Sequence, residues 1–223
     1  PPGVAARAAA RLPCPRGRDG AVYRTALAEA GVTAESIRSL DDIRRLPFTT
    51  KADLRAHYPL GFLAVPRERV QRIHGSSGTT GKPTFVAYTA ADVALWAGLV
   101  APFLTAGGLR PGRLVHIAFG YGLFTGGFGL HYGVEAAGAG VVPAAAGNTE
   151  RQIMLLRDLG AHAIVCTPSY ALTIAEVMRT QGVDPASLPL ACGHFGGEPW
   201  TEDMRHAIER EFGILAFNNY GCI

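Results

Sequence analysis

The residues best suited to chemistry form a loop rich in glycine and hydroxyl side chains, Gly75-Ser-Ser-Gly-Thr-Thr-Gly-Lys-Pro83. Glycines let the backbone turn tightly and bring its N–H groups close to a ligand. Hydroxyl groups add hydrogen-bond donors and the lysine adds a positive charge. The loop is therefore predicted to hold phosphate oxygens through Ser76, Ser77, Gly78, Thr79, Thr80, Gly81 and Lys82, with Lys82 and Thr79 as the catalytic candidates.

Other interpretations of this loop fit less well. A Walker P-loop needs G-x-x-x-x-G-K-[ST] between a strand and a helix, but Ser76 stands where the first glycine should and Pro83 follows the lysine. The G-x-S-x-G elbow of serine hydrolases is absent. An amidase-type Ser/Lys site could use Ser76 and Ser77, but the Thr-Thr-Gly-Lys continuation does not suit it. A plain polar hairpin loop is the remaining alternative.

The elements around the loop predict an α/β fold. Short strand-like runs at 70–74 and 84–88 flank it. Helical patterns precede it at 21–30 and in two segments that begin with an expected N-cap, Ser39 and Thr50. Beyond it, helices and strands alternate. Helices are expected at 90–106, 126–137, 149–159, 169–181 and 201–212, and strands at 114–118, 140–143, 161–166, 190–195 and 214–218. This alternation is typical of a mostly parallel sheet covered by helices on both faces, with ligands bound beyond the carboxyl ends of its strands.

Composition excludes several classes of protein. The chain has 223 residues, 48% hydrophobic and 17% charged, and a net charge of +3. A net charge this small does not indicate a nucleic-acid-binding surface, although four arginines lie in the first twenty residues. The four cysteines are far apart, which favours free thiols in a reduced cytoplasm. No secretory signal is predicted, because no N-terminal stretch combines a charged start with an apolar run. No membrane span is predicted either, since the two long uncharged runs contain Pro102 or many glycines.

Several motifs in order along the chain resemble those of phenylacetate–CoA ligases, within the acyl-adenylate-forming superfamily of acyl-CoA synthetases. Besides the glycine-rich loop, the resemblance is carried by five segments and extends from about Tyr23 to the last residue. These segments are Leu46-Pro-Phe-Thr-Thr-Lys51, Gly120-Tyr-Gly-Leu-Phe-Thr-Gly-Gly127, Gly147-Asn-Thr-Glu-Arg151, Cys166-Thr-Pro-Ser-Tyr170 and Phe195-Gly-Gly-Glu-Pro-Trp200.

The resemblance implies an enzyme that adenylates an aryl carboxylic acid with ATP and Mg²⁺ and transfers the acyl group to CoA. The glycine-rich loop would hold the β- and γ-phosphates. The adenine site would be formed by Gly196, Gly197, Glu198, Pro199 and Tyr220. The acid would lie against Phe119, Tyr121, Phe124, Gly197 and His194. A buried strand histidine is the alternative for His194, and a helix cap for Glu198.

The chain departs from the family pattern at its end. Relatives carry a Mg²⁺-binding Glu shortly after the Tyr-Gly pair, whereas this chain reads Cys222-Ile223, so the metal ligand is expected beyond Ile223. The family's C-terminal domain and its catalytic Lys are also absent. We therefore expect an incomplete large domain, with an N-terminal arm and helical segment over residues 1–69 and an ATP- and acid-binding region over residues 70–223.

Two other functions stay open at this point. One is the loading of an aryl acid onto a carrier-protein thiol instead of CoA. The other is a non-catalytic nucleotide- or acid-binding module. Gly197 replaces an alanine common in relatives, so with His194 nearby we expect room for an aryl ring bearing a hydroxyl or amino group. The choice of acid and a homodimeric state are not fixed by the sequence.

Overall fold

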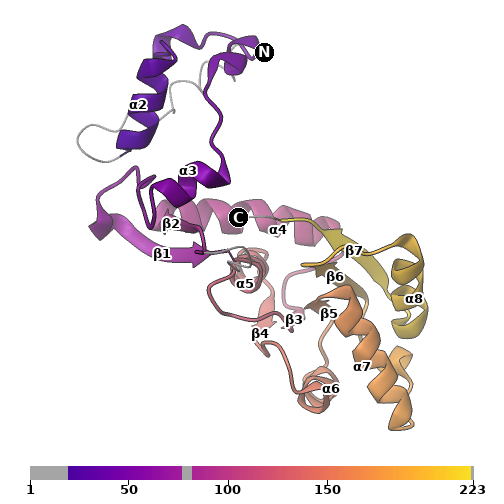
Figure 1. The fold of residues 1–223 in the computed structure, drawn as a ribbon. Helices are drawn as coiled ribbons and strands as arrows, with labels where there is room; N and C mark the ends of the chain where they lie inside the picture. The colour runs from indigo at the N-terminus through magenta and orange to yellow at the C-terminus, as the bar shows by residue number, and fades with distance from the viewer. Residues whose placement is uncertain (1–19, 77–81, 222–223) are drawn as a thin grey trace. The chain divides into compact units, whose positions relative to one another are not determined.

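The protein is described by a computed structural model that covers residues 20–76 and 82–221. The chain divides into two compact units, Pro1–Ala90 and Ala91–Ile223, which are described separately (Figure 1). The first unit contains the helices α2 (Ala21–Glu29), η1 (Ala34–Ser36), η2 (Asp41–Arg45), α3 (Lys51–Ala56) and η3 (Arg67–Arg69) and the strands β1 (Val70–Gly75) and β2 (Phe85–Thr89).

Local side-chain contacts fix the helices of the first unit. Thr50 and Asp53 form a reciprocal capping box at the start of α3, as the sequence predicts. The start of η2 differs from expectation, because Ser39 does not act as a cap. Instead the Asp42 carboxylate accepts hydrogen bonds from the backbone N–H groups of Arg38 and Ser39, at 3.0 and 2.8 Å, so the acid organises this turn.

An antiparallel hairpin of β1 and β2 carries the glycine-rich loop. The strands pair from Val70 opposite Thr89 to Gly75 opposite Phe85, with an irregularity between Val70 and Arg72. A strand therefore lies on each side of the loop. This arrangement distinguishes it from a Walker P-loop, which joins a strand to a helix.

The second unit is an α/β layer structure. It contains the helices α4 (Ala90–Ala106, whose first residue belongs to the other unit), α5 (Gly126–Ala136), α6 (Thr149–Asp158), α7 (Pro168–Thr180), η4 (Pro185–Ser187) and α8 (Glu202–Phe212), and the strands β3 (Leu114–Ile117), β4 (Gly140–Val142), β5 (Ala163–Cys166), β6 (Cys192–Gly196) and β7 (Leu215–Asn219). The five strands are parallel and lie in the order β4-β3-β5-β6-β7.

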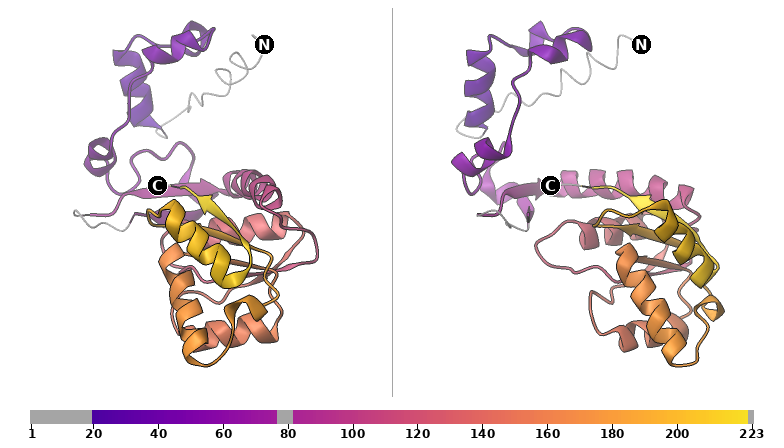
Figure 2. Two further views of the ribbon diagram at one scale, coloured as in Figure 1. Left: turned by 90° about the vertical axis from the view of Figure 1, so that its right-hand side faces the viewer. Right: turned by 45° about the vertical axis from the view of Figure 1, so that its right-hand side comes forward.

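Two hydrophobic clusters cover the two faces of this sheet. Residues of α6, α7 and α8 pack on one face, where Ile164, Phe195 and Phe212 are buried. Residues of α4 and α5 pack on the other, against Val115, Ile117 and Val165 of β3 and β5. Two different views show α7 and α8 together on the same side of the sheet (Figure 2). The α/β class expected from the alternating pattern is confirmed.

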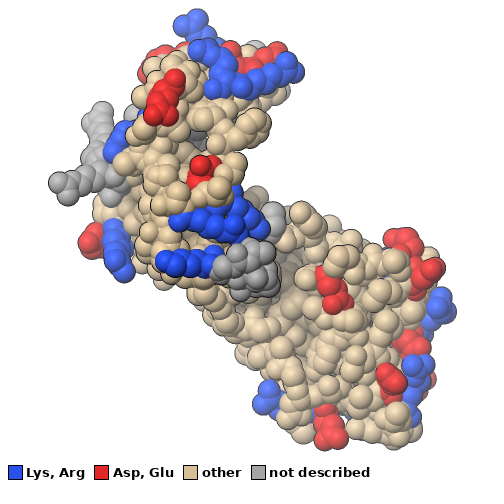
Figure 3. All heavy atoms as spheres, in the orientation of Figure 1, with Lys and Arg blue, Asp and Glu red and all other residues tan. Residues whose placement is uncertain are grey.

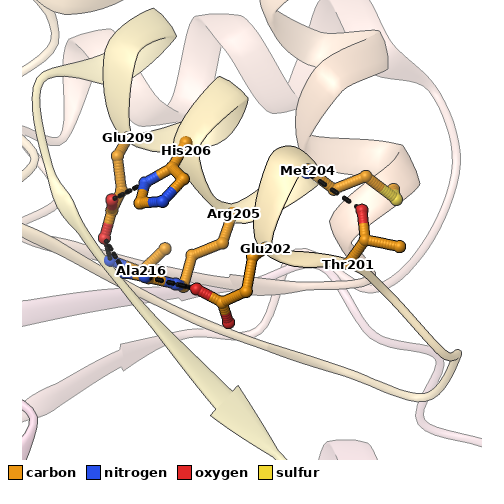
Figure 4. Close-up of polar contacts among 7 residues, drawn as sticks. All are labelled: Thr201, Glu202, Met204, Arg205, His206, Glu209 and Ala216. Carbon is orange, nitrogen blue, oxygen red and sulfur yellow. Dashed lines mark hydrogen bonds and ion pairs between the residues drawn. The ribbon is translucent and has the colours of Figure 1, made fainter.

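Charged residues on α8 support the fold. The Thr201 hydroxyl caps the helix by accepting from the N–H of Met204, and Arg205 pairs with Glu202 and Glu209 (Figure 4). Glu209 also accepts from the backbone N–H of Ala216, at 3.2 Å, which ties α8 to the edge strand β7. These contacts account for Glu202, Arg205 and Glu209 without any role in chemistry.

The surface and the cysteines agree with an ordinary globular protein. Acidic and basic side chains mix around the part that holds α7 and α8 on the face drawn in Figure 3.

Cys166 and Cys192 are free, buried thiols, and burial raises the pKa of both. Within residues 20–76 and 82–221, every helix is either too short or too polar to cross a bilayer.

Candidate active site

A hollow of about 440 Å³ lies at the carboxyl edge of the five-stranded sheet. Its walls come from the segments that follow β3, β4 and β5, namely Ala118, Phe119, Gly120, Ala146, Gly147, Thr167, Ser169, Tyr170 and Thr173. Open parallel sheets bind their ligands at this edge, because the connecting segments diverge there. The lining combines an aromatic ring with hydroxyl and backbone groups, which suits a flat ligand that also carries polar atoms.

The start of α7 forms one wall of the hollow. The Thr167 hydroxyl accepts from the N–H of Tyr170, at 3.4 Å, and Glu198 Oε1 accepts from the N–H of Ser169, at 2.7 Å. The first N–H groups of a helix need such acceptors, and a carboxylate also complements the helix dipole there. Glu198 therefore serves α7, whereas α8 is capped by Thr201. The cap that sequence analysis considered for Glu198 exists at a different helix.

Gly197 follows β6 and lies against the walls of the hollow. Its φ of +84° is in the left-handed region that favours glycine. A Cβ built on it would lie 3.5 Å from Phe119 Cε1 and 3.6 Å from Thr167 Cγ2, which is ordinary van der Waals contact. The missing methyl group therefore leaves space between two residues that line the hollow.

The predicted adenine residues follow neighbouring strands. Gly196 and Asn219 pair across β6 and β7, and a Cβ on Gly196 would lie 2.3 Å from the Asn219 carbonyl oxygen. This close approach of two backbones explains the glycine. Tyr220, one residue beyond β7, is 93% exposed, and Pro199 is also exposed. The ring of Tyr220 is thus free to contact a ligand.

The predicted acid-binding aromatic residues separate in the structure. Phe119 lines the hollow, whereas Tyr121 and Phe124 are not among its lining residues. Phe124 is 48% exposed. Tyr121 packs edge-on against Phe128, with ring centroids 5.3 Å apart. Of the three aromatic residues expected to wall the acid site, only Phe119 therefore lines this hollow.

A chain of polar contacts holds Tyr121. Its hydroxyl lies 3.2 Å from His131 Nδ1, and His131 Nε2 lies 3.3 Å from a carboxylate oxygen of Glu135. Burial, assisted by the charge of Glu135, raises the pKa of Tyr121 to about 12. The phenol is therefore protonated, and it is hydrogen-bonded to His131. These contacts give His131 a defined role in fixing the tyrosine ring.

His194 is buried on the α4 side of the sheet and does not line the hollow. Its ring lies between Phe103 and Phe217, with centroids 5.3 and 5.4 Å away, and is only 1% exposed. Burial lowers the pKa of His194 to about 4, a shift that the nearby Asn219 side chain opposes only in part. Its ring nitrogens make no regular hydrogen bond in the described structure. The imidazole is therefore neutral at pH 7.

We expect His194 to make the protein less stable in mild acid. The unfolded chain protonates this histidine below about pH 6.5, whereas the folded chain does so only near pH 4. Falling pH thus favours the unfolded state across this window, by about 2 kcal/mol between pH 6.5 and 5. Urea unfolding at pH 7.5 and 5 should show a smaller loss in His194→Leu than in the wild type. Equal losses in both proteins would contradict the assignment.

The glycine-rich loop is anchored at its base within the first unit. The Ser76 N–H donates to the Thr84 carbonyl oxygen at 3.0 Å, and Ser76 Oγ accepts from the N–H and hydroxyl of Thr84 at 3.0 and 3.1 Å. Lys82 is exposed, with Nζ 4.9 Å above the ring of Tyr58. The predicted phosphate ligands Ser77, Gly78, Thr79, Thr80 and Gly81 lie outside the described residues, so their roles stay predictions.

Sequence analysis missed several residues of the hollow. Thr167, Ser169, Tyr170 and Thr173 belong to it, but no role was assigned to them. A usable signal was present, because Cys166–Tyr170 and Gly147–Arg151 are two of the segments that carry the family resemblance, and both follow expected strands. The hollow thus gathers segments that sequence analysis had recognised only as motifs.

Metal ligands are a separate question. In residues 20–76 and 82–221, His, Cys, Asp and Glu side chains form no group of three or more that could hold a metal ion. Glu198, the carboxylate beside the hollow, is engaged by the Ser169 N–H. The hollow's own donor set of hydroxyl groups fits a polar organic ligand better than a bare cation. The Mg²⁺ ligand expected beyond Ile223 stays a prediction.

The fold and the hollow define an α/β protein with a ligand-sized hollow at the carboxyl edge of a parallel sheet, and comparison with known proteins shows that it is similar to acyl-CoA ligases. The chain is 54% identical over 199 residues to phenylacetate-coenzyme A ligase of Thermus thermophilus and 50% identical over 201 residues to that of Escherichia coli. These matches cover 89% and 90% of this chain. The chain spans just under half the length of each relative, 45% and 46%. No protein-family model matches it.

A solved structure gives the same result. The chain matches 2-hydroxyisobutyryl-CoA ligase, in complex with 2-HIB-AMP and CoA in the thioesterification state, with a TM-score of 0.89 and 31% identity. The match covers 97% of this chain and 48% of the ligase. The resemblance predicted from the motifs to phenylacetate–CoA ligases and the adenylate-forming superfamily is therefore confirmed.

Proposed function

We propose that this chain is the ATP- and acid-binding part of an AMP-forming aryl acid–CoA ligase. The observation that carries the proposal is the hollow at the carboxyl edge of the sheet, whose walls contain Gly120, Gly147 and Thr167 from three segments that carry the resemblance. The matched ligase structure, which holds an acyl-adenylate and CoA, supports the same chemistry.

In the first step, an oxygen of the acid's carboxylate attacks the α-phosphorus of ATP. A bond forms between carboxylate and phosphorus, the bond to the β-phosphate oxygen breaks, and pyrophosphate leaves. The nucleophile belongs to the substrate, so the protein contributes position and charge stabilisation. Lys82 and the loop residues 76–81 would offset the negative charge of the departing phosphates.

The remaining site residues would place the two substrates. The backbone of Gly196 to Pro199, with the exposed ring of Tyr220, would hold adenine. Phe119 and the space beside Gly197 would receive the aryl ring, while Tyr121, Phe124 and His194 would shape its surroundings. We propose residues 70–223 as the region that binds both substrates, with residues 1–69 as an accessory segment.

In the second step, the CoA thiolate attacks the acyl carbon and AMP leaves with the electron pair of the broken bond. Relatives are about twice as long as this chain, so we propose that this step uses groups outside it. A magnesium ion, when bound, would neutralise phosphate charge in the first step, and its protein ligand is expected beyond Ile223.

Acid-dependent exchange of pyrophosphate into ATP tests the adenylation step in the full-length protein. We expect exchange with phenylacetate or ring-substituted aryl acids, and none without an acid. Adding CoA or a carrier protein then identifies the acceptor by the thioester that forms. ATP binding without exchange, across a panel of aryl acids, would instead indicate a non-catalytic binding module.

A further inference from the structure

The loop between β4 and α6 has an unusual backbone. Ala145, Gly147 and Asn148 have φ values of +61°, +86° and +51°. Two of these residues are not glycine, and left-handed backbone is unfavourable for an L-residue with a Cβ. Such a conformation persists only where its surroundings hold it, and it is commonest at functional sites. Here the loop supplies Ala146 and Gly147 to the hollow.

Gln152, in the second turn of α6, makes the contacts that hold this loop. Its side chain is fully buried. The Nε2 amide group donates to the carbonyl oxygens of Ala145 and Gly147, both at 2.9 Å. The carbonyls on either side of Ala146 are thus bonded to one side chain, which fixes the orientation of the intervening peptide groups.

The other end of the Gln152 amide contacts β3. Its Oε1 is hydrogen-bonded to Nε2 of His116, a residue that is also fully buried. Because the amide nitrogen of Gln152 serves two carbonyl oxygens, its oxygen is the acceptor and His116 must carry its proton on Nε2. Burial lowers the pKa of His116, although the hydrogen bond that it donates to Gln152 opposes this, and the lowered pKa favours the neutral ring.

Gln152 therefore links two walls of the hollow. His116 belongs to the strand that leads directly into Ala118 and Phe119, and Ala145 also donates its N–H to the Ile117 carbonyl oxygen at 3.1 Å. Through these bonds the small residues Ala146 and Gly147 keep a fixed position relative to Phe119. A ligand between the two walls would depend on that spacing.

We propose that Gln152 is a positioning residue, which holds the 145–148 loop in its left-handed conformation and thereby sets the width of the hollow for the aryl acid or its adenylate. Only the identity of this ligand rests on the proposed function. Gln152 does not itself line the hollow, so its effect on binding passes through Ala146 and Gly147.

Three variants of the full-length protein separate this role from general stability. Gln152→Met keeps the volume and removes all three hydrogen bonds. Gln152→Glu keeps an acceptor for His116 but loses both N–H donors to the loop at neutral pH. The control, Ile153→Val, makes a small cavity beside Gln152 on the same helix, where Ile153 is 3% exposed in the core. Its aliphatic side chain cannot hydrogen-bond to the loop carbonyls.

Hydrogen–deuterium exchange of the peptide covering 145–148 is the primary measurement. We expect exchange at least tenfold faster than in the wild type in both Gln152 variants, and unchanged in Ile153→Val. Misplacement of a binding wall costs roughly 10²-fold in kcat/KM. We expect a loss of this order for phenylacetate in both Gln152 variants and little change in the control.

The outcomes distinguish the inference from the proposed function. If the wild type shows no acid-dependent pyrophosphate exchange, the proposed function fails. Hydrogen–deuterium exchange of the loop in the Gln152 variants then still decides whether Gln152 holds the loop. If hydrogen–deuterium exchange of the loop is as slow in both Gln152 variants as in the wild type, the inference is overturned even in an active enzyme. Kinetic losses as large in Ile153→Val as in Gln152→Met would also overturn it, by assigning the effect to stability.

Discussion

Replacing Lys82 by alanine in the full-length protein is expected to slow acid-dependent pyrophosphate exchange by a factor of about 10²–10³. That is the usual cost of removing one group that stabilises developing charge. The side chain is exposed and its Nζ makes a cation–π contact with Tyr58, which is worth about 0.5–1 kcal/mol at exposed sites. The fold should therefore tolerate the change. Initial exchange rates at saturating ATP and phenylacetate measure the effect.

Arg67→Ala is the matched control for the Lys82 variant. Arg67 is an exposed cation in the same compact unit, on η3 immediately before β1, and no site role is proposed for it. The Arg67→Ala variant removes one positive charge from the same unit, as Lys82→Ala does, and leaves the sequence of the loop unchanged. If the two variants lose the same activity, the effect is one of net charge, and Lys82 does not act on the phosphates.

The sequence predicted the layers of the second unit well because its helices and strands alternate regularly along the chain. Strand β5, for example, was expected at 161–166 and forms at Ala163–Cys166, where all four side chains are buried. A short apolar run between two helical patterns has few alternatives in an α/β protein. The glycine-rich loop was assigned to phosphate binding from its glycine and hydroxyl residues, and this assignment stays a prediction.

The hollow was harder to predict because it depends on which segments meet. Phe119 and Thr167 are 48 positions apart, and only the sheet order β4-β3-β5 places the segments after β3 and β5 side by side. Pairing of Glu198 with the Ser169 N–H could not be read from either motif alone. Long-range partners are set by topology, which local patterns do not specify.

Buried polar residues were the least predictable part. Gln152 stands in an amphipathic helix where a glutamine normally faces solvent, yet it is fully buried. His116 and His194 are both buried, but their surroundings differ. His116 is hydrogen-bonded to Gln152, whereas His194 lies among aromatic rings. No spacing rule distinguishes these environments. They follow from the packing of side chains against the finished sheet.

Gly197→Ala is expected to change which aryl acid is preferred. The added methyl group would enter the space between Phe119 and Thr167, at 3.5 and 3.6 Å, without a steric clash. Filling one such gap is worth about 1–3 kcal/mol in discrimination, or about 10–200-fold. Acids with a hydroxyl or amino group on the ring should lose kcat/KM relative to phenylacetate by this factor. Parallel measurement of kcat/KM for both acids gives the ratio directly.

Backbone strain is the competing explanation, and Gly213→Ala isolates it. Gly213 ends α8 with a φ of +67°, close to the +84° of Gly197, so alanine should cost each site a similar amount, about 1–2 kcal/mol of stability. A Cβ at Gly213 would meet only Ala186, at 3.9 Å, and neither residue lines the hollow. Gly213→Ala should therefore lower the free energy of unfolding without changing the ratio of kcat/KM between the two acids. If both variants shift that ratio equally, or if neither does, the space beside Gly197 does not select the acid.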